Sequence, residues 1–265
     1  MSTVTPTRTT SLLAPLMLRS DLSRDAATTY WAKTHADKVI RLPHLLEYNQ
    51  RLFSSTDHGF WPATAGIGTS IPRTWHLDGC AEIRFTSAAA MLRTGLHSRE
   101  VFLDEQNVFT RVLAHHTGPR GGRWFTDGYD NSAQQHVALL LRRRMGVAAR
   151  MFRSFVHQQL SPALMAAGAR DLRSYAFLPY TPLLGGSPGV AHDNPPQHRY
   201  HAAVFFGVDD RAALDELLTH DNLAEVLDTQ HTVLTAVHGY AVERTVPVIG
   251  RSRTTSFNLI EGTTP

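Results

Sequence analysis

The strongest chemical signal in the sequence is a tryptophan and a histidine, Trp31 and His35, that lie four positions apart. On a helix, residues four apart share one face, and Val39 and Leu42 extend that face as an apolar stripe. A histidine on such a stripe packs into the core, where loss of hydration favours the neutral imidazole. Neutral imidazole takes a proton from a phenol or an activated carbon acid and returns it. We therefore interpret His35 as a general base; a core histidine bonded to a backbone carbonyl is the alternative.

Two carboxylates and one tyrosine of the same half are candidate partners of this base. Glu82 lies in the middle of an apolar segment, and Asp78 lies where that segment begins. If the strand face that carries Glu82 lines a cavity, its carboxylate could orient a histidine or serve as a second acid or base. A structural ion pair with Arg84 or Arg111 explains the same carboxylate equally well. Tyr48, kept protonated, could serve as the acid instead, and Asp78 at a turn could contact substrate.

Aromatic side chains gather in the same half of the chain. Trp61 and Trp75 fall in a segment rich in Gly, Pro and Thr, which predicts a loop. Large rings in a loop need a reason to be buried, and a flat aromatic substrate beneath a loop lid supplies one. Packing into the core is the alternative. Besides Asp78, the predicted substrate-binding side chains are Tyr30, Trp31, Trp61 and Trp75, with Tyr48 beside them.

The histidines and the single cysteine give no metal-binding pattern, although the chain has 15 histidines. His115 and His116 are adjacent, so on a strand their side chains point to opposite faces. His198 and His201 are three positions apart and face opposite ways for the same reason. Because Cys80 is the only cysteine, a disulfide or a Cys-based zinc site within the chain is excluded. We expect no metal and a reducing, cytoplasmic setting.

Charge and hydropathy exclude two classes of partner. The formal net charge is +3, and the one basic run, the arginines at 142–144, falls at a predicted strand end. A nucleic-acid surface needs a clustered basic face with side chains that read the bases, so we expect no nucleic-acid partner. No apolar run reaches the roughly 18 residues of a membrane span, so we predict none. The chain also starts without the apolar region of a secretory signal.

Apolar spacing and breaker residues predict the elements that must hold these side chains. Ser23 is placed as the N-cap of the helix that carries His35, and Pro43 ends that helix. On the segment that carries Glu82, apolar and polar residues alternate, as on a strand. The predicted order in the first half is strand 11–19, helix 23–42, strand 44–53, loop 54–76, strand 77–85, helix 87–96 with a further turn to 103, and strand 108–117.

The same order recurs in the second half of the chain. Residues 118–131, rich in Gly and Asp, predict a linker between a first unit at 10–117 and a second at 132–250. Tyr175 occupies the position in the second unit that Tyr48 has in the first. The predicted elements are strand 136–144, helix 147–168, strand 172–181, loop 182–197, strand 198–208, helix 209–218 with a further turn over 222–230, and strand 237–249.

A repeated βαββαβ unit predicts the architecture. This order is that of the ferredoxin-like motif, and repetition of a whole unit is strong evidence for a fold. One four-stranded antiparallel sheet with helices on one face leaves its other face bare. Two such sheets can bury these faces against each other. We therefore predict an α+β fold in which tandem ferredoxin-like units form an intramolecular version of the dimeric α+β barrel.

The segment at 19–48, RSDLSRDAATTYWAKTHADKVIRLPHLLEY, resembles the EthD-like family of dimeric α+β barrel proteins. The family pattern is a strand ending in Arg, a Ser-capped helix with Tyr-Trp and then His, a Leu-Pro, and a strand with Tyr. The segments DGCAEIRF at 78–85 and DEQNVF at 104–109 also fit it. The resemblance covers about residues 10–117. The second half keeps the element order but lacks the Tyr-Trp and His signature; it carries His157 on its first helix.

The resemblance implies a function in polyketide tailoring, although one fold supports many reactions. We expect a cofactor-independent cyclase or dehydratase that acts on a small aromatic polyketide-type intermediate. His35 would take a proton beside a carbonyl or from a phenol. Glu82 or Tyr48 would help a hydroxyl group leave or would stabilise an enolate.

Two further functions and one assembly stay open at this point. One is a monooxygenase acting on an anthrone or polyphenol, either without a cofactor or with haem held by His35 or His97. The other is a barrel that binds a ligand without catalysis. Pairing of two chains into a homodimer is also compatible with the sequence.

Overall fold

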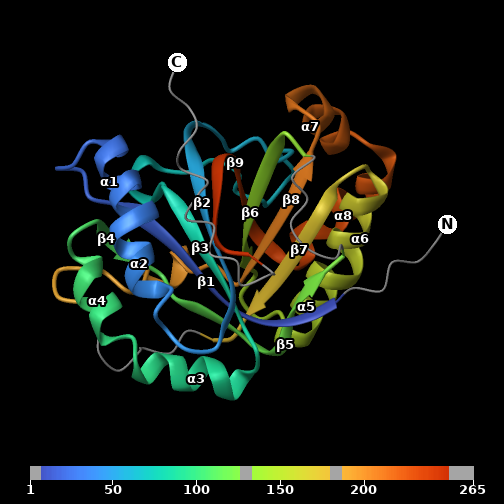
Figure 1. Cartoon of the computed structure of the whole chain (residues 1–265). Coiled ribbons are helices and arrows are strands. Elements are labelled where there is room, and N and C mark those ends of the chain that lie inside the picture. The colour runs from blue at the N-terminus through green and yellow to red at the C-terminus, as the bar shows by residue number, and fades with distance from the viewer. Residues whose placement is uncertain (1–6, 126–132, 180–186, 251–265) are drawn as a thin grey trace.

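The structure is a computed structural model that describes residues 7–125, 133–179 and 187–250. Its centre is a closed barrel of eight strands with helices packed on its outside (Figure 1). No helix in these ranges is long and apolar enough to cross a membrane. With strands in a closed ring and helices outside it, the architecture is a mixed α/β barrel.

The first half of the barrel is built from five strands and four short helices. A π-helical turn, Trp31–His35, connects the first two helices without a break. The elements are β1 (Thr7–Leu18), α1 (Arg24–Tyr30), α2 (Ala36–Val39), β2 (Leu45–His58), β3 (Gly79–Phe85), α3 (Ala88–Leu96), α4 (Arg99–Glu105), β4 (Phe109–Val112) and β5 (His115–Trp124).

The second half repeats this order with four strands. Its first helix also contains a π-helical turn, Phe155–Leu160. The elements are β6 (Gln135–Arg143), α5 (Ala149–Ser154), α6 (Ser161–Ala166), β7 (Arg170–Phe177), β8 (Ala202–Val208), α7 (Arg211–Leu218), α8 (Asp221–Thr229) and β9 (Leu234–Ile249).

The strands close into a ring through antiparallel pairs that join the two halves. The order is β3-β2-β9-β6-β8-β7-β5-β1, and β1 pairs with β3 to complete it, while the short β4 adds to β1. Within the first half the pairing order is β2-β3-β1-β5, and within the second it is β7-β8-β6-β9. The halves meet where β2 pairs with β9 and β5 pairs with β7. The described strands therefore leave no open edge in the ring.

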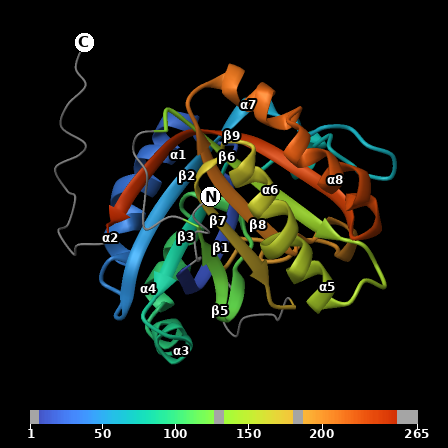
Figure 2. The same cartoon turned by 90° about the vertical axis from the view of Figure 1, so that its right-hand side faces the viewer.

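Strand alternation divides the buried side chains into three cores. On β6, Ala138 and Leu140 point into the barrel, whereas Val137, Leu139 and Leu141 point outward under the helices of the second half. The helices of the first half cover the opposite side of the barrel (Figures 1 and 2). The middle of β6 is thus buried on both faces, and each face has its own chemistry.

The helix that carries His35 is fixed at its start and altered in its middle. The Ser23 side chain accepts a hydrogen bond from the Ala26 backbone N–H at 3.2 Å, which caps α1 as expected. The π-helical turn then follows at Trp31 and ends at His35. Such turns are rare and occur frequently at functional sites.

Differences from the predicted elements have local causes. β2 continues to His58, inside the expected loop, because it pairs with β9. β5 continues to Trp124, inside the expected linker, and the linker residues from 126 onward lie outside the described residues. β8 begins only at Ala202, after a 3₁₀ turn at Pro196–His198. The 3₁₀ turn includes His198, so the strand cannot begin where the sequence predicted it.

The predicted correspondence between Tyr48 and Tyr175 is wrong. Tyr48 points outward into the core under the helices of the first half, whereas Tyr175 points into the barrel. A shift of one residue along a strand moves a side chain to the other face.

Candidate active site

An apolar cavity of about 130 Å³ lies between the outer face of the first-half strands and the helices that cover them. Its walls come from β1, β2 and β3, from the turn with Trp31 and His35, and from α3 and α4. The exposed Gly95 of α3 belongs to its wall, so the cavity reaches the surface there. The ionisable side chains in its wall are His35, Tyr48, Glu105 and His116.

His35 is held by a carboxylate behind it. Its Nδ1 lies 2.9 Å from Oδ2 of Asp104, and both residues are buried. The His35 ring also meets Phe109 edge to face, with ring centroids 5.3 Å apart. Among the described residues, Asp104 is the one side chain that bonds the imidazole. These contacts fix the ring in one orientation against the cavity wall.

Asp104 stays ionised, which decides where the proton of the imidazole sits. Burial by itself raises the pKa of Asp104, but four donated hydrogen bonds outweigh burial and hold that pKa well below its usual range. An ionised carboxylate only accepts hydrogen bonds, so Nδ1 of His35 carries the proton and donates it. In the neutral ring Nε2 is then the basic nitrogen. The donors to Asp104 are His35, Tyr30, Asn107 and Lys38.

Glu105, the next residue on α4, also lines the cavity. Burial and, to a smaller extent, the negative charge of Asp104 outweigh an opposing hydrogen bond from Ser187 and raise its pKa to about 7. The Ser187 hydroxyl donates to Oε2 of Glu105. Glu105 therefore changes its protonation near neutral pH, as a general acid must.

A segment of the second half closes over this carboxylate. Ser187 and Val190 lie between β7 and β8, and Val190 packs into the first-half core. The Ser187 backbone N–H donates to Nε2 of His192 at 2.9 Å. The other nitrogen of His192 lies 3.2 Å from the Val112 carbonyl oxygen and donates to it. This segment supports Glu105 from outside the cavity.

Tyr48 supplies a permanent hydroxyl donor. It is fully buried, and burial raises its pKa to about 12. Its oxygen accepts a hydrogen bond from Nε2 of Gln50 at 2.8 Å, and Trp31 also donates to it. The hydroxyl proton of Tyr48 therefore stays in place at physiological pH. An enolate oxygen in the cavity could therefore accept a hydrogen bond from the Tyr48 hydroxyl.

The structure brings together some of the predicted site residues. His35, Tyr48 and Trp31 line one cavity. Tyr30 lies behind it, where its hydroxyl donates to Oδ1 of Asp104 at 2.7 Å. Tyr30 thus acts on the base through Asp104 and is not part of the cavity wall.

Glu82 is not part of this site. It lies on the face of β3 that points into the barrel, opposite the face with Ala81 that lines the cavity. Arg51 binds its Oε2 through Nε at 2.9 Å and Nη2 at 2.7 Å. Burial raises the pKa of Glu82, but the charges of Arg51 and Arg173 more than reverse this and bring it to about 2. A carboxylate held ionised in this way cannot donate a proton near neutral pH.

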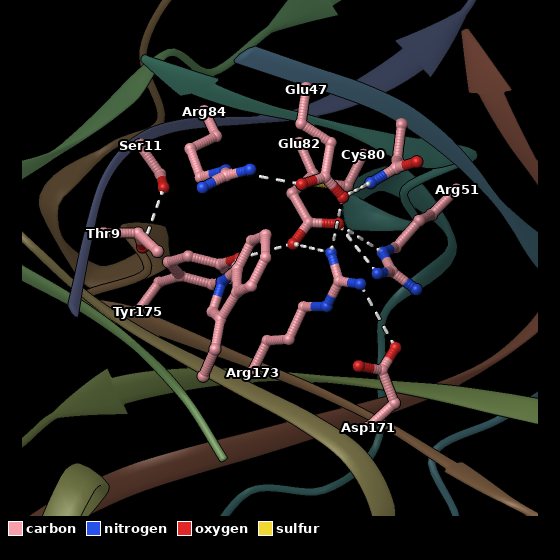
Figure 3. A network of polar contacts seen from close by, with 12 residues as sticks. Thr9, Ser11, Glu47, Arg51, Cys80, Glu82, Arg84, Asp171, Arg173 and Tyr175 are labelled. Atoms are coloured by element: carbon pink, nitrogen blue, oxygen red, sulfur yellow. Dashed lines mark hydrogen bonds and ion pairs between the residues drawn. The ribbon is translucent and has the colours of Figure 1, made fainter. Parts of the chain in front are cut away.

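The charges around Glu82 form one buried network that joins the two halves (Figure 3). Arg173 of β7 lies 3.4 Å from Glu82, 3.1 Å from Glu47 and 3.2 Å from Asp171. Tyr175, also on β7, donates to Glu82. The expected ion pair of Glu82 with Arg84 or Arg111 is therefore replaced by pairs with Arg51 on the neighbouring β2 and with Arg173 across the barrel. This arrangement ties β3 to β7.

Three other predicted substrate contacts lie elsewhere. Trp61 packs into the core of the second half, and its Nε1 donates to Gln230 at 3.0 Å. Trp75 stacks on His198 with ring centroids 4.1 Å apart. Asp78 accepts from Nη1 of Arg24 at 2.9 Å and from the Leu18 N–H at 2.8 Å. None of the three side chains lines the cavity.

Sequence reasoning did not identify Asp104, Glu105 or His116 as site residues. Asp104 and Glu105 lie in the DEQNVF segment, which was recognised only as part of a family pattern. Two adjacent carboxylates at the end of a helix, just before a strand, were the available signal. His116 lines the cavity while His115 stacks on Phe177, so the adjacent histidines do face opposite ways.

The residues present do not fit a haem. The cavity is similar in volume to an engineered cavity of about 150 Å³ that accommodates benzene, far less than a porphyrin requires. His97 is exposed, and its Nδ1 lies 3.0 Å from the Arg93 carbonyl oxygen. Among the residues that the structure describes, no three His, Cys, Asp or Glu side chains could hold a metal ion together.

Comparison with solved structures identifies the fold. A proposed monooxygenase from Lactobacillus acidophilus is similar at a TM-score of 0.52 and 10% identity, over 91% of this chain and 97% of that one. An anthrone oxidase-like protein is similar at a TM-score of 0.56 and 7% identity, over 94% of this chain and 97% of that one. A proposed monooxygenase from Fusobacterium nucleatum is similar at a TM-score of 0.54 and 6% identity, over 92% of this chain and 96% of that one. The fold is thus of the dimeric α+β barrel type.

Sequence comparisons identify no family. No family model matches the chain. No curated protein matches it either.

Proposed function

We propose that this protein is an enzyme that oxidises a small phenolic or anthrone-type substrate with O₂, without a bound cofactor, and that His35 removes the first proton. The observation that carries the proposal is the contact between His35 and the ionised Asp104 at the wall of an apolar cavity. It leaves Nε2 as the basic nitrogen. The similarity to an anthrone oxidase-like protein and to proposed monooxygenases supports oxidation over the other reactions considered.

The first step forms a carbanion. Nε2 of His35 takes a proton from the ring CH₂ group, which is conjugated with the carbonyl through the flanking aromatic rings, and the negative charge moves onto the carbonyl oxygen. Tyr48, whose pKa of about 12 keeps it protonated, donates to that oxygen. Asp104 stabilises the imidazolium that forms, as a carboxylate does behind a catalytic histidine.

The remaining steps consume O₂ and release water. The carbanion adds to O₂, and the proton held by His35 converts the adduct into a hydroperoxide. His35 then takes the second proton from the same carbon, the O–O bond breaks, and a carbonyl forms with loss of hydroxide. Glu105, with its pKa of about 7, gives its proton to that hydroxide, and the imidazolium restores it. The net change is CH₂ and O₂ to C=O and H₂O.

The cavity limits how the substrate binds. Its volume of about 130 Å³ suits one aromatic ring. A larger substrate would place its reacting ring against Trp31 and extend past Gly95, where the wall is exposed. Aromatic polyketides have this flat shape, so they remain within the proposed substrate class.

A dehydratase or cyclase is the second candidate, because Glu105 is an acid inside the cavity. A carboxyl group with a pKa of about 7 can protonate a hydroxyl group that leaves as water. In that reaction His35 removes the proton from the neighbouring carbon. This candidate needs no O₂.

We also infer that the chain is a tandem pair of ferredoxin-like units and that the first unit carries the site. The pairing orders β2-β3-β1-β5 and β7-β8-β6-β9 support this inference, since they correspond strand by strand. In the second unit, His157 lies 2.7 Å from the Ser174 hydroxyl, and burial lowers its pKa to about 4. No carboxylate comparable to Asp104 holds it among the described residues.

The reaction class is tested by following O₂ and product mass together. The purified protein is incubated with a hydroxylated anthrone and with a polyketide-like alcohol, in air and under nitrogen. We expect O₂ uptake and a product that has gained one oxygen atom and lost two hydrogens, only in air. Loss of one water under nitrogen would support the dehydratase instead. Binding without any product would support a non-catalytic barrel.

A further inference from the structure

A second cluster of polar side chains lies at one end of the barrel interior. On β6, Ala138 and Leu140 point into the barrel, and Arg142 is the next residue on that face. Arg111 of β4, Trp75 and His198 lie at the same end, as the contacts below establish. None of these side chains lines the cavity with His35. The cluster is therefore separate from the candidate active site.

Ring and guanidinium contacts connect the members of this cluster. The Arg111 guanidinium lies 4.7 Å from the centre of the Trp75 ring, and Trp75 stacks on His198 at 4.1 Å. The Arg142 guanidinium lies 5.0 Å from the centre of the Tyr200 ring. The pKa of His198 is lowered, mainly by burial and to a smaller extent by the positive charges of Arg142 and Arg111. Both guanidinium groups therefore act on the same imidazole.

The two arginines have no counter-charge among the described residues. Neither Arg111 nor Arg142 forms an ion pair there, whereas the network around Glu82 pairs its arginines with carboxylates. Asp193, the acidic residue of the neighbouring loop, pairs with Arg199. Burial lowers the pKa of Arg111, as expected for a cation without an acidic partner. This end of the barrel thus carries unbalanced positive charge.

Buried nitrogens in the cluster also lack hydrogen-bond partners among the described residues. They are Nε of Arg111, Nε of Arg142 and Nδ1 of His198. A guanidinium Nε–H can only donate, and a buried donor without an acceptor is costly. In native proteins such groups are satisfied by water or by a bound ion. Two cationic donors around one imidazole favour an anionic acceptor.

We propose that this end of the barrel binds a small anion, with Arg111 and Arg142 donating to a carboxylate or phosphate group beside the Trp75 and His198 rings. The planar guanidinium groups suit the planar carboxylate in particular. Such a site would select ligands by charge. It does not depend on the proposed oxidation, because no residue is shared with the cavity.

The site is tested by titrating the wild-type chain with benzoate, acetate and inorganic phosphate at low ionic strength. Binding is followed by calorimetry, and the Nε–H signals of arginine are followed by nuclear magnetic resonance. We expect saturable binding by at least one of the anions and shifts in the Nε–H signals of Arg111 and Arg142. Stronger binding of benzoate and acetate than of phosphate would identify a carboxylate site, and the reverse a phosphate site.

Variants separate this site from general charge effects. Arg111→Gln and Arg142→Gln should each weaken binding about tenfold, the effect of one charge-assisted hydrogen bond. Arg143→Gln is the matched control: it removes the same charge from the next residue of β6, which strand alternation places on the opposite face. It should change binding less than about threefold. The proposal is overturned if none of the anions saturates the wild-type chain, if neither Nε–H signal moves, or if Arg143→Gln matches Arg142→Gln.

Discussion

Oδ2 of Asp104 lies 2.9 Å from Nδ1 of His35, and this contact determines which nitrogen of the imidazole is free to act as a base. The carboxylate comes from the end of α4 and the imidazole from the π-helical turn after α1. Tyr30, one residue before that turn, donates to the other oxygen of Asp104 at 2.7 Å. The orientation of the base thus depends on two segments that are far apart in sequence.

Replacing Asp104 by Asn should impair catalysis while preserving the shape of the site. An amide does not stabilise the imidazolium, and it can donate to Nδ1 and so turn the basic lone pair away from the cavity. We expect turnover to fall by about 10²-fold or more, with a smaller change in KM. Steady-state kinetics of Asp104→Asn check this, and unchanged turnover would remove Asp104 from the mechanism.

The same carboxylate should make the fold sensitive to acid. Its pKa is lowered in the folded protein, so its contribution to stability is present above the ordinary carboxyl pKa and is lost as the pH falls toward the folded value. We expect the free energy of unfolding of the wild type to drop more steeply below about pH 4 than that of Asp104→Asn. Urea titrations at several pH values measure this. If the unfolding free energies of the wild type and of Asp104→Asn fell in parallel with decreasing pH, this role of Asp104 would be contradicted.

Glu105 should affect both activity and stability at a higher pH than Asp104 does, between the ordinary carboxyl pKa and neutral pH. Its pKa is raised from 4.5 to about 7, so the folded state holds a proton that the unfolded state has released. Its contribution to the free energy of unfolding should therefore be lost as pH rises between these values, by on the order of 3 kcal/mol relative to a variant without the carboxyl group. Activity should also fall above about pH 7, because the acid is lost.

Glu105→Gln should remove this pH dependence. The amide is close in size and does not titrate, so the difference in unfolding free energy between the wild type and Glu105→Gln should shrink by this amount as pH rises over the same range. Turnover should be low at every pH, because no proton is available to the leaving hydroxide. A Glu105→Gln variant with the wild-type pH profile would show that another group titrates.

The buried network should matter for stability and not for turnover. Removing Arg173 leaves Glu82 and Asp171 short of a counter-charge inside the barrel. We expect Arg173→Met to cost about 3–5 kcal/mol of unfolding free energy. On the same strand, Arg170 pairs with Asp209 near the surface, so Arg170→Met should cost less than about 1 kcal/mol. Equal losses in the two variants would contradict the network's structural role.

Two tryptophans should respond differently to replacement by Phe. Trp31 lines the cavity, so Trp31→Phe should raise KM by about tenfold, as the loss of a specific substrate contact does. Trp61 bonds Gln230 in the other core, so Trp61→Phe should cost about 1–3 kcal/mol of stability and leave KM unchanged. Kinetics and urea unfolding of both variants test the distinction. A KM effect at Trp61 alone would reverse it.

The sequence was informative about elements and less so about which face of a strand matters. The alternation around Glu82 was correct, with Ala81 on one side and Glu82 on the other. In a barrel covered by helices both faces of a strand are buried, so alternation alone cannot tell the cavity face from the interior. That is why Glu82 was assigned to the site, although its partner Arg173 lies across the barrel.

Contacts between distant segments were the other obstacle. Trp61 was predicted beside the substrate because a large ring in a loop needs a reason to be buried, yet β2 pairs with β9 and Trp61 packs into the second core. Asp104 contacts His35 only because the fold packs α4 against the π-helical turn, and the sequence alone does not indicate this packing. Side-chain type and spacing predicted His35 as a candidate base, but the residues that contact it could be found only from the fold.

The most direct test of the account is the turnover of His35→Gln with a hydroxylated anthrone in air. The matched control is His157→Gln, on the equivalent helix of the second half, where the imidazole bonds Ser174. We predict that His35→Gln lowers turnover by about 10²–10⁴-fold, the usual contribution of a general base, while His157→Gln stays within about threefold of the wild type. A folded His35→Gln variant with turnover within about threefold of the wild type would contradict the central claim.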